Sequence, residues 1–129
     1  MKKKILFVCI GNSCRSQMAE GFARHLGSKR IQASSAGSRP AGFVAAGAIE
    51  VMKEKGIDIS GHASKSVEDF RGQKFDAVVT MGCGDACPWV PAERRFDWRI
   101  PDPMGQSSEV FRQVRDQIEE QVRLLLGQI

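Results

Sequence analysis

The chain has 129 residues, 42% of them hydrophobic, which suits one globular domain (residues 1–129) with a single core. Its formal net charge of +4 is spread along the sequence and only 7% of the residues are aromatic, so it lacks the basic stripe of a nucleic-acid-binding protein. The apolar run after MKKK is too short for a secretory signal, and no segment has membrane-spanning length, so we expect a cytoplasmic monomer with no nucleic-acid or membrane partner.

The first half of the chain predicts two strands and two helices. The apolar run at residues 5–8 is typical of a short buried strand, and the spacing of Met18, Phe22 and Leu26 predicts a helix over residues 16–27. The next expected elements are a strand over residues 31–37 and a helix over residues 41–56, which has Val44, Ala48, Ile49 and Met52 on one face and ends at Gly56.

The second half of the chain predicts two more strands and a long helix. Residues 74–82, KFDAVVTMG, contain the short β-branched run of a buried strand. A proline-rich irregular region follows, with a short strand near residues 94–98. The last element is a helix that Ser107 can cap, and its apolar positions are Val110, Val114, Ile118, Val122 and Leu125.

Strands and helices alternate along the chain, and this pattern favours an α/β fold. We expect three layers, with a four-stranded parallel sheet covered by helices on both faces. Ligands of such sheets bind beyond the carboxyl ends of the strands. Cys9 and Cys14 follow the first strand, and Cys83 and Cys87 follow the strand at 74–82. The fold therefore brings both pairs of cysteines to one edge of the sheet.

Residues 9–16, which we call the anion loop, have the composition of an oxyanion site. The backbone N–H groups at a helix start converge on an anion, and Gly11 and Asn12 tolerate the backbone angles of a tight turn. Arg15 can bind two oxygens of the anion at once. The predicted binding residues are Gly11, Asn12, Ser13, Cys14, Arg15 and Ser16.

Cys9 stands at the mouth of the anion loop, where the N–H dipoles, Arg15 and the Ser16 hydroxyl would stabilise a thiolate. We therefore expect Cys9 to be a nucleophile. The alternative is a buried cysteine at a strand end, followed by an ordinary turn. Cys14 has no evident chemical role, and we expect a packed, inert thiol.

The C-x5-R-S loop resembles the signature of the low-molecular-weight tyrosine phosphatase fold, and the run CIGNSCRSQMAEGF is more similar to the arsenate reductases built on that fold. SSAG at residues 34–37, GIDISGH at 56–62 and the Asp102-Pro103 pair extend the resemblance over nearly the whole chain. The anion loop is common to both groups. Cys83 and Cys87 favour the reductase, because a phosphatase has no use for two further thiols.

The resemblance implies an enzyme that converts arsenate to arsenite by a thiol relay, without a metal or other cofactor. Cys9 attacks arsenic while Asp102 acts as general acid, Cys83 then attacks the Cys9 sulfur, and Cys87 frees Cys9. The resulting Cys83–Cys87 disulfide needs an outside thiol reductant. Thioredoxin is the first expectation, although the short spacer between these cysteines keeps glutaredoxin with glutathione, or mycothiol, as alternatives.

Geometry gives a further expectation for the segment at residues 82–91. Cysteines four apart on a helix are too far apart for a relaxed disulfide, and Pro88 disfavours helical geometry at Cys87. We therefore expect an irregular segment that rearranges during turnover.

Other functions remain open at this point. Cys83 and Cys87 could instead bind zinc or form a permanent disulfide, and the chain could be a tyrosine phosphatase or a regulatory phosphate-sensing module. Asp102 could be an ordinary turn residue, in which case Asp97 and Asp85 are weaker candidates for the acid.

Some similar arsenate reductases hold potassium. Asn12, Glu20 and Ser35 match its expected ligands, but Ala63 and Lys65 replace a hydroxyl and a carboxylate. We predict that the Lys65 ammonium takes the place of the ion and pairs with Glu20, and that activity does not depend on potassium.

Overall fold

A parallel four-stranded sheet organises the computed structural model, which describes residues 2–82 and 90–129. The strands are β1 (Lys3–Cys9), β2 (Ile31–Gly37), β3 (Phe75–Met81) and β4 (Ala92–Trp98). Their order across the sheet is β2-β1-β3-β4, and every neighbouring pair is parallel. The predicted parallel sheet is confirmed, including the strand near residues 94–98.

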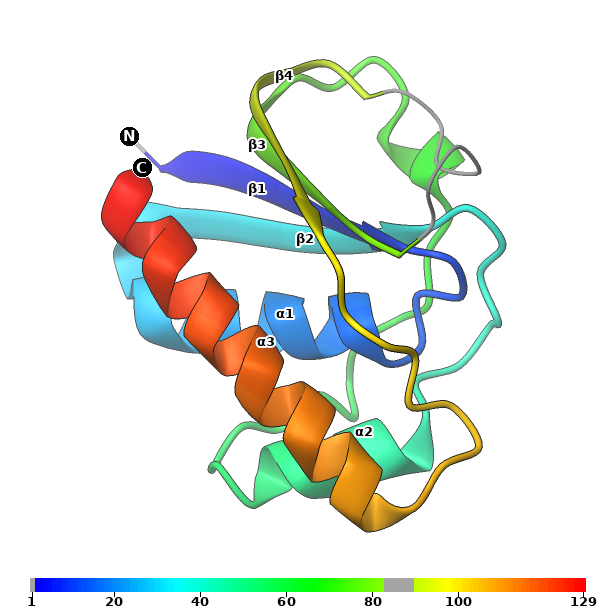
Figure 1. Ribbon diagram of the computed structural model, residues 1–129. Helices are drawn as coiled ribbons and strands as arrows, with labels where there is room; N and C mark the ends of the chain where they lie inside the picture. Colours follow the sequence, from blue (N-terminus) through cyan, green and yellow to red (C-terminus); the bar gives the residue numbers. More distant parts are fainter. Residues whose placement is uncertain (1, 83–89) are drawn as a thin grey trace.

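Helices cover the two faces of this sheet unequally (Figure 1). The α-helices are α1 (Arg15–Gly27), α2 (Ala46–Lys53) and α3 (Ser108–Gln128). All three lie on one side of the sheet, where α2 packs against α1 and α3. The other face carries the 3-10 helix η2 (Val67–Phe70), whose Val67 packs on Leu6 and Val8 of β1. The short 3-10 helix η1 (Ser28–Arg30) leads from α1 into β2. The predicted three layers are present, with a thin layer on the η2 side.

The alternation of side chains along β1 explains this arrangement. Ile5, Phe7 and Cys9 point to the α-helical face, whereas Leu6 and Val8 point to the η2 face. The apolar stripe of α3 covers the first face, as its spacing predicts, and Ser107 Oγ accepts a hydrogen bond from the Val110 N–H at 3.4 Å at the start of the helix.

The second helix is shorter than predicted. It begins at Ala46, so residues 41–45, including Val44, are not helical. Their backbone bonds to the anion loop instead: Ala41 N–H donates to the Gly11 carbonyl at 2.8 Å, and Ala45 N–H donates to the Ser13 carbonyl at 3.0 Å. These contacts between distant segments outweigh the local preference for helix.

The chain leaves β1 for β2 on one side and returns to β3 on the other, so the direction of winding reverses at the carboxyl end of β1. Such a switch point leaves a crevice where ligands bind in open parallel sheets. The anion loop lies at this crevice. Within residues 2–82 and 90–129, no helix is both long enough and apolar enough to cross a membrane.

Candidate active site

The anion loop joins the last residue of β1, Cys9, to the first residue of α1, Arg15. Asn12 has a left-handed backbone conformation with φ of 46°, which asparagine tolerates better than most residues. Gly37 at the end of β2 packs against this turn. A Cβ atom there would lie 2.5 Å from the Ile10 carbonyl oxygen and 2.9 Å from the Asn12 nitrogen, so this position requires glycine.

The Cys9 sulfur receives hydrogen bonds inside the loop. Asn12 N–H donates to Sγ at 3.3 Å, and Ser16 Oγ lies 2.9 Å from Sγ. The Ser16 hydroxyl also accepts a bond from Asn12 Nδ2 at 2.7 Å, so its single proton is directed to the sulfur. The start of α1 adds its positive dipole end. The sulfur thus faces two hydrogen-bond donors and the start of a helix, which is the arrangement that a nucleophilic cysteine requires.

Arg15 is anchored on one side and open on the other. Its Nη1 donates to the carbonyl oxygens of Met81 at 2.8 Å and Ile100 at 3.1 Å. Its Nε has no hydrogen-bond partner among the described residues, and the same holds for the buried hydroxyl of Ser13. Buried donors usually have partners, so these orphaned groups indicate a place for a ligand rich in acceptor oxygens.

A cavity of about 50 Å³ lies over the anion loop. Its volume suits a few water-sized groups, which is the size of one small oxyanion. The residues that line it are Cys9, Gly11, Ser13, Cys14, Arg15, Ala41, Asp102 and Met104. The structure therefore brings the predicted nucleophile, arginine and acid together around one small space.

Asp102 stands at the mouth of this cavity with 53% of its side chain exposed. Its Oδ2 lies 3.7 Å from Arg15 Nη2, and its Oδ1 accepts a hydrogen bond from the Met104 N–H at 3.1 Å. Asp97 instead accepts a bond from the Thr80 hydroxyl at 2.9 Å and does not line the cavity. Of these two aspartates, Asp102 is the one placed to meet a ligand; Asp85 lies outside the described residues.

Cys14 differs from Cys9 although both line the cavity. Burial raises the pKa of the Cys14 thiol to about 12, and the charges of Asp102 and Cys9 act in the same direction. The thiol is therefore protonated at neutral pH, as expected for a packed, inert cysteine.

Cys83 and Cys87 lie outside the described residues, and so does most of the segment that we expect to rearrange. The residue before Cys83 is Gly82, which has φ of 78° and packs so closely on Arg15 that a Cβ atom would overlap the guanidinium. The end of β3 thus reaches the anion loop. Among the described residues, no group of three or more His, Cys, Asp or Glu side chains could hold a metal ion.

Most of the contacts that support the anion loop from behind could not be predicted from the sequence motif. Gln17 Nε2 donates to the Asn12 backbone carbonyl at 3.1 Å, and Ser64 Oγ donates to the Gly11 carbonyl at 3.2 Å. Glu20 accepts a bond from Ser35 Oγ at 2.6 Å, and Lys65 Nζ lies 3.7 Å from the same carboxylate. The predicted pairing of Lys65 with Glu20 is confirmed.

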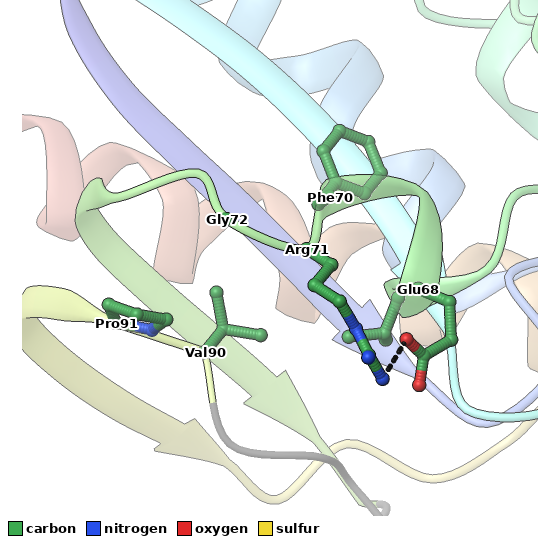
Figure 2. A pocket seen from close by; sticks show the side chains of 7 residues that line it. Glu68, Phe70, Arg71, Gly72, Val90 and Pro91 are labelled. Carbon is green, nitrogen blue, oxygen red and sulfur yellow. Dashed lines mark ion pairs between the residues drawn. The ribbon is translucent and has the colours of Figure 1, made fainter.

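A second hollow, of about 260 Å³, lies on the η2 side of the sheet (Figure 2). Glu68 and Arg71 form an ion pair at 2.6 Å on one side, and Val90 and Pro91 lie opposite. The remaining lining residues are Val67, Phe70 and Gly72. None of its lining side chains is a nucleophile, so the catalytic groups are those of the cavity over the anion loop.

Comparisons with known proteins agree with this geometry. A family model described as low molecular weight phosphotyrosine protein phosphatase matches residues 4–129. The chain is 48% identical to the glutaredoxin arsenate reductase of Synechocystis sp., with 98% of each chain covered, and 43% identical to arsenate reductase 2 of Staphylococcus saprophyticus, with 95% of each covered. It is also similar to a solved arsenate reductase in a phosphate-binding state, with a TM-score of 0.91, 48% identity and 98% of each chain covered. The similarity thus extends far beyond the anion loop.

Proposed function

The chain belongs to the low molecular weight phosphotyrosine protein phosphatase family, and we propose that it uses the family's anion loop to reduce arsenate to arsenite. One observation favours this function over phosphate hydrolysis, namely two additional cysteines that follow β3 in the sequence. Cys83 follows directly on Gly82, which packs against Arg15, and Cys87 comes four residues later. The identity with arsenate reductases over nearly the full chain supports the same choice.

Substrate binding uses the open donors of the anion loop. Arsenate is a tetrahedral anion of nearly the shape of phosphate, and the similar reductase in a phosphate-binding state supports this mode of binding. Arg15 Nε has no partner among the described residues, and together with Nη2, which faces Asp102 at 3.7 Å, it can bind two oxygens. The Ser13 hydroxyl and the loop N–H groups can bind the others. The Cys9 sulfur then faces arsenic.

The first chemical step joins Cys9 to arsenic. A sulfur–arsenic bond forms, an arsenic–oxygen bond breaks, and Asp102 protonates the departing hydroxide to water. The bound anion competes with Asp102 for Arg15, which lies 3.7 Å from the carboxylate, and this leaves the carboxyl group free to carry the proton.

Electron transfer follows in the second step. The Cys83 thiolate attacks the Cys9 sulfur, the sulfur–arsenic bond breaks, and its electron pair stays on arsenic, which leaves as arsenite. Cys87 then attacks Cys83, releases the Cys9 thiolate and forms the Cys83–Cys87 disulfide. An external thiol reductant reduces this disulfide, so two electrons pass from the reductant to arsenic in each cycle.

The reductant is a thiol-based electron donor. The 48% identity with a glutaredoxin arsenate reductase supports glutaredoxin with glutathione, and we adopt this donor. The pair formed by Cys83 and Cys87 supports thioredoxin as the second candidate, because a complete dithiol can be reduced directly. We further propose that the protein works as a cytoplasmic monomer, since cytoplasmic reductants keep such thiols reduced.

Steady-state arsenite production tests the proposal, with glutaredoxin and glutathione, or thioredoxin and its reductase, as the sole electron source. The wild-type protein should turn over with at least one of the two donors. Cys83→Ser should bind arsenate but stop at the Cys9 adduct. Hydrolysis of an aryl phosphate, measured alongside, should survive Cys83→Ser because it needs only Cys9, Arg15 and Asp102. A wild-type protein that hydrolyses the phosphate but makes no arsenite with either donor would be a phosphatase.

A further inference from the structure

Gln17 lies behind the anion loop, on the first turn of α1, and is fully buried. Its Nε2 lies 3.1 Å from the Asn12 backbone oxygen, 3.0 Å from Asn12 Oδ1 and 2.9 Å from the Ala63 backbone oxygen. Its Oε1 lies 3.0 Å from Nδ1 of His62. One amide therefore joins α1, the anion loop and the segment at residues 62–65.

The partners of Gln17 determine which way its amide points. The backbone oxygens of Asn12 and Ala63 can only accept hydrogen bonds, so the NH₂ group must face them. The Gln17 oxygen then faces His62, and Nδ1 of that ring must carry a proton to donate to it. The structure thus specifies the tautomer of His62.

The hydrogen bonds between Gln17 and the Cys9 sulfur also have fixed directions. Asn12 Oδ1 accepts from the Lys65 backbone N–H at 2.7 Å as well as from Gln17, so Asn12 Nδ2 is turned toward Ser16. Ser16 Oγ accepts from Nδ2 at 2.7 Å, and its proton is left for the Cys9 sulfur at 2.9 Å. In this series of hydrogen bonds each residue donates to the next, and the last donor, Ser16, faces the Cys9 sulfur.

We propose that Gln17 is a positioning residue for the nucleophile, because it fixes the orientation of Asn12 and thereby makes Ser16 a hydrogen-bond donor to Cys9. Gln17 holds Asn12 at both its backbone carbonyl and its side chain, in a turn whose backbone is left-handed at Asn12. When the Gln17 donors are lost, only the Lys65 backbone N–H still holds Asn12 Oδ1, so the Asn12 amide is less firmly oriented and Ser16 can donate to Asn12 instead of to the sulfur. This inference rests on the part of the proposed function that makes Cys9 the nucleophile.

The charges around this network favour a neutral His62. Burial lowers the pKa of His62, although Glu20 Oε2 lies 3.6 Å from Nδ1 and opposes the effect. Arg24 and Lys65 add to the lowering, and Asp58 acts against it. The Gln17 oxygen requires a proton on Nδ1, and in a neutral ring this is the tautomer with its single proton on Nδ1.

Alkylation of Cys9 as a function of pH, followed by mass spectrometry of the Cys9 peptide, tests this role without arsenate. Gln17→Glu keeps the size of the side chain but removes its donors, and Gln17→Met removes them without adding charge. Both should move the pH midpoint of Cys9 alkylation upward by about one unit, because the sulfur loses a hydrogen-bond donor. Gln113→Glu, on an exposed position of α3, is the control with the same chemical change and should leave the midpoint unchanged.

The pathway through Ser16 is tested by a double-mutant cycle. Ser16→Ala should raise the midpoint to a similar extent, and the combination of Ser16→Ala with Gln17→Met should raise it no further, because both changes remove the same donor. Fully additive effects, or a wild-type midpoint in both Gln17 variants, would overturn the proposal. This comparison measures alkylation and not arsenite production. A protein that does not reduce arsenate would therefore be detected in the arsenite assay, independently of the role of Gln17.

A measurement on the wild-type protein keeps the test independent of how the variants fold. Nitrogen-15 NMR distinguishes the two neutral tautomers of histidine, and the chain has two histidines, so His25→Gln assigns the signals. The proton of His62 should reside on Nδ1. A proton on Nε2 at neutral pH would contradict the orientation of Gln17 and, with it, the proposed role.

Discussion

The Lys65 ammonium lies 3.7 Å from Oε1 of Glu20, a carboxylate that is almost completely buried beside Ser35. The Lys65 backbone N–H also donates to Asn12 Oδ1 at 2.7 Å, so one residue supplies a positive charge to Glu20 and a hydrogen bond to the anion loop. A cation next to this ammonium would be repelled.

Potassium should therefore not stimulate turnover. The measurement compares the arsenate reduction rate in sodium and potassium chloride at equal ionic strength, and equal rates are expected. The variant Ala63→Thr/Lys65→Asp supplies the missing hydroxyl and carboxylate, and it should acquire a potassium dependence. Severalfold stimulation of the wild-type enzyme would refute the substitution of the ion by Lys65.

Gly37→Ala, at the end of β2, should distort the backbone of the anion loop. The added Cβ atom would lie 2.5 Å from the Ile10 oxygen and 2.9 Å from the Asn12 nitrogen, and both are backbone atoms that cannot move away easily. We expect a loss of about 1–3 kcal/mol in the free energy of unfolding, together with slower alkylation of Cys9. Gly61→Ala is the matched control, because no described atom lies within 4 Å of its Cβ position. Similar behaviour of the two variants would disprove this packing constraint.

The chemistry of the anion loop could be predicted because its residues are close in sequence. Cys9, Gly11, Asn12 and Arg15 form a local turn whose requirements are visible in the motif. The alternation of strands and helices predicts that ligands bind at the carboxyl ends of the strands, and the cavity over the anion loop lies at that edge of the sheet.

The supporting contacts could not be predicted, since they join segments far apart in the chain. Gln17 contacts Ala63, and Ser64 contacts Gly11, and neither pair leaves a local pattern. The same reason explains why residues 41–45 are not helical, as they bond to the anion loop. The apolar side of η2 leaves no pattern in the sequence either, because a single 3-10 turn is too short to show a period.

Cys14 should make the protein less stable at alkaline pH. The pKa of its thiol is raised from 9.0 to about 12 by burial, so the folded state retains a proton that the unfolded state loses above pH 9. The contribution of the protonated Cys14 thiol to the free energy of unfolding is fully present below pH 9. It falls by up to about 1.4 kcal/mol per pH unit as the pH rises toward 12.

Urea unfolding at pH 8 and pH 10.5 measures this effect. The wild-type protein should lose more stability between the two pH values than Cys14→Ala, which lacks the titrating group. If the two proteins lost stability equally, the Cys14 thiol would not be the group responsible.

Arg115→Met should weaken the junction of α2 and α3. Arg115 is buried, and its Nη1 donates to the Val51 carbonyl at 3.0 Å and to Glu54 at 2.6 Å at the end of α2. Loss of these bonds leaves a buried carbonyl unsatisfied, and we expect a cost of about 2 kcal/mol. Arg112→Met removes a more exposed partner of the same Glu54, and its cost in stability should be clearly smaller. Chemical denaturation measures the free energy of unfolding of both variants. Equal losses would argue against a special contribution of the buried bond from Arg115 to the Val51 carbonyl.

The relay from Cys83 through Cys9 to arsenic is tested most directly by trapping its intermediate. Cys87→Ser lacks the thiol that resolves the first disulfide, and it is incubated with arsenate in the absence of any reductant. The account predicts one arsenite per protein and a Cys9–Cys83 disulfide in the peptide mass map, whereas the wild-type protein yields a Cys83–Cys87 disulfide. Arsenite release without a disulfide at Cys9 in this variant, or no arsenite from the wild-type protein, would contradict the relay.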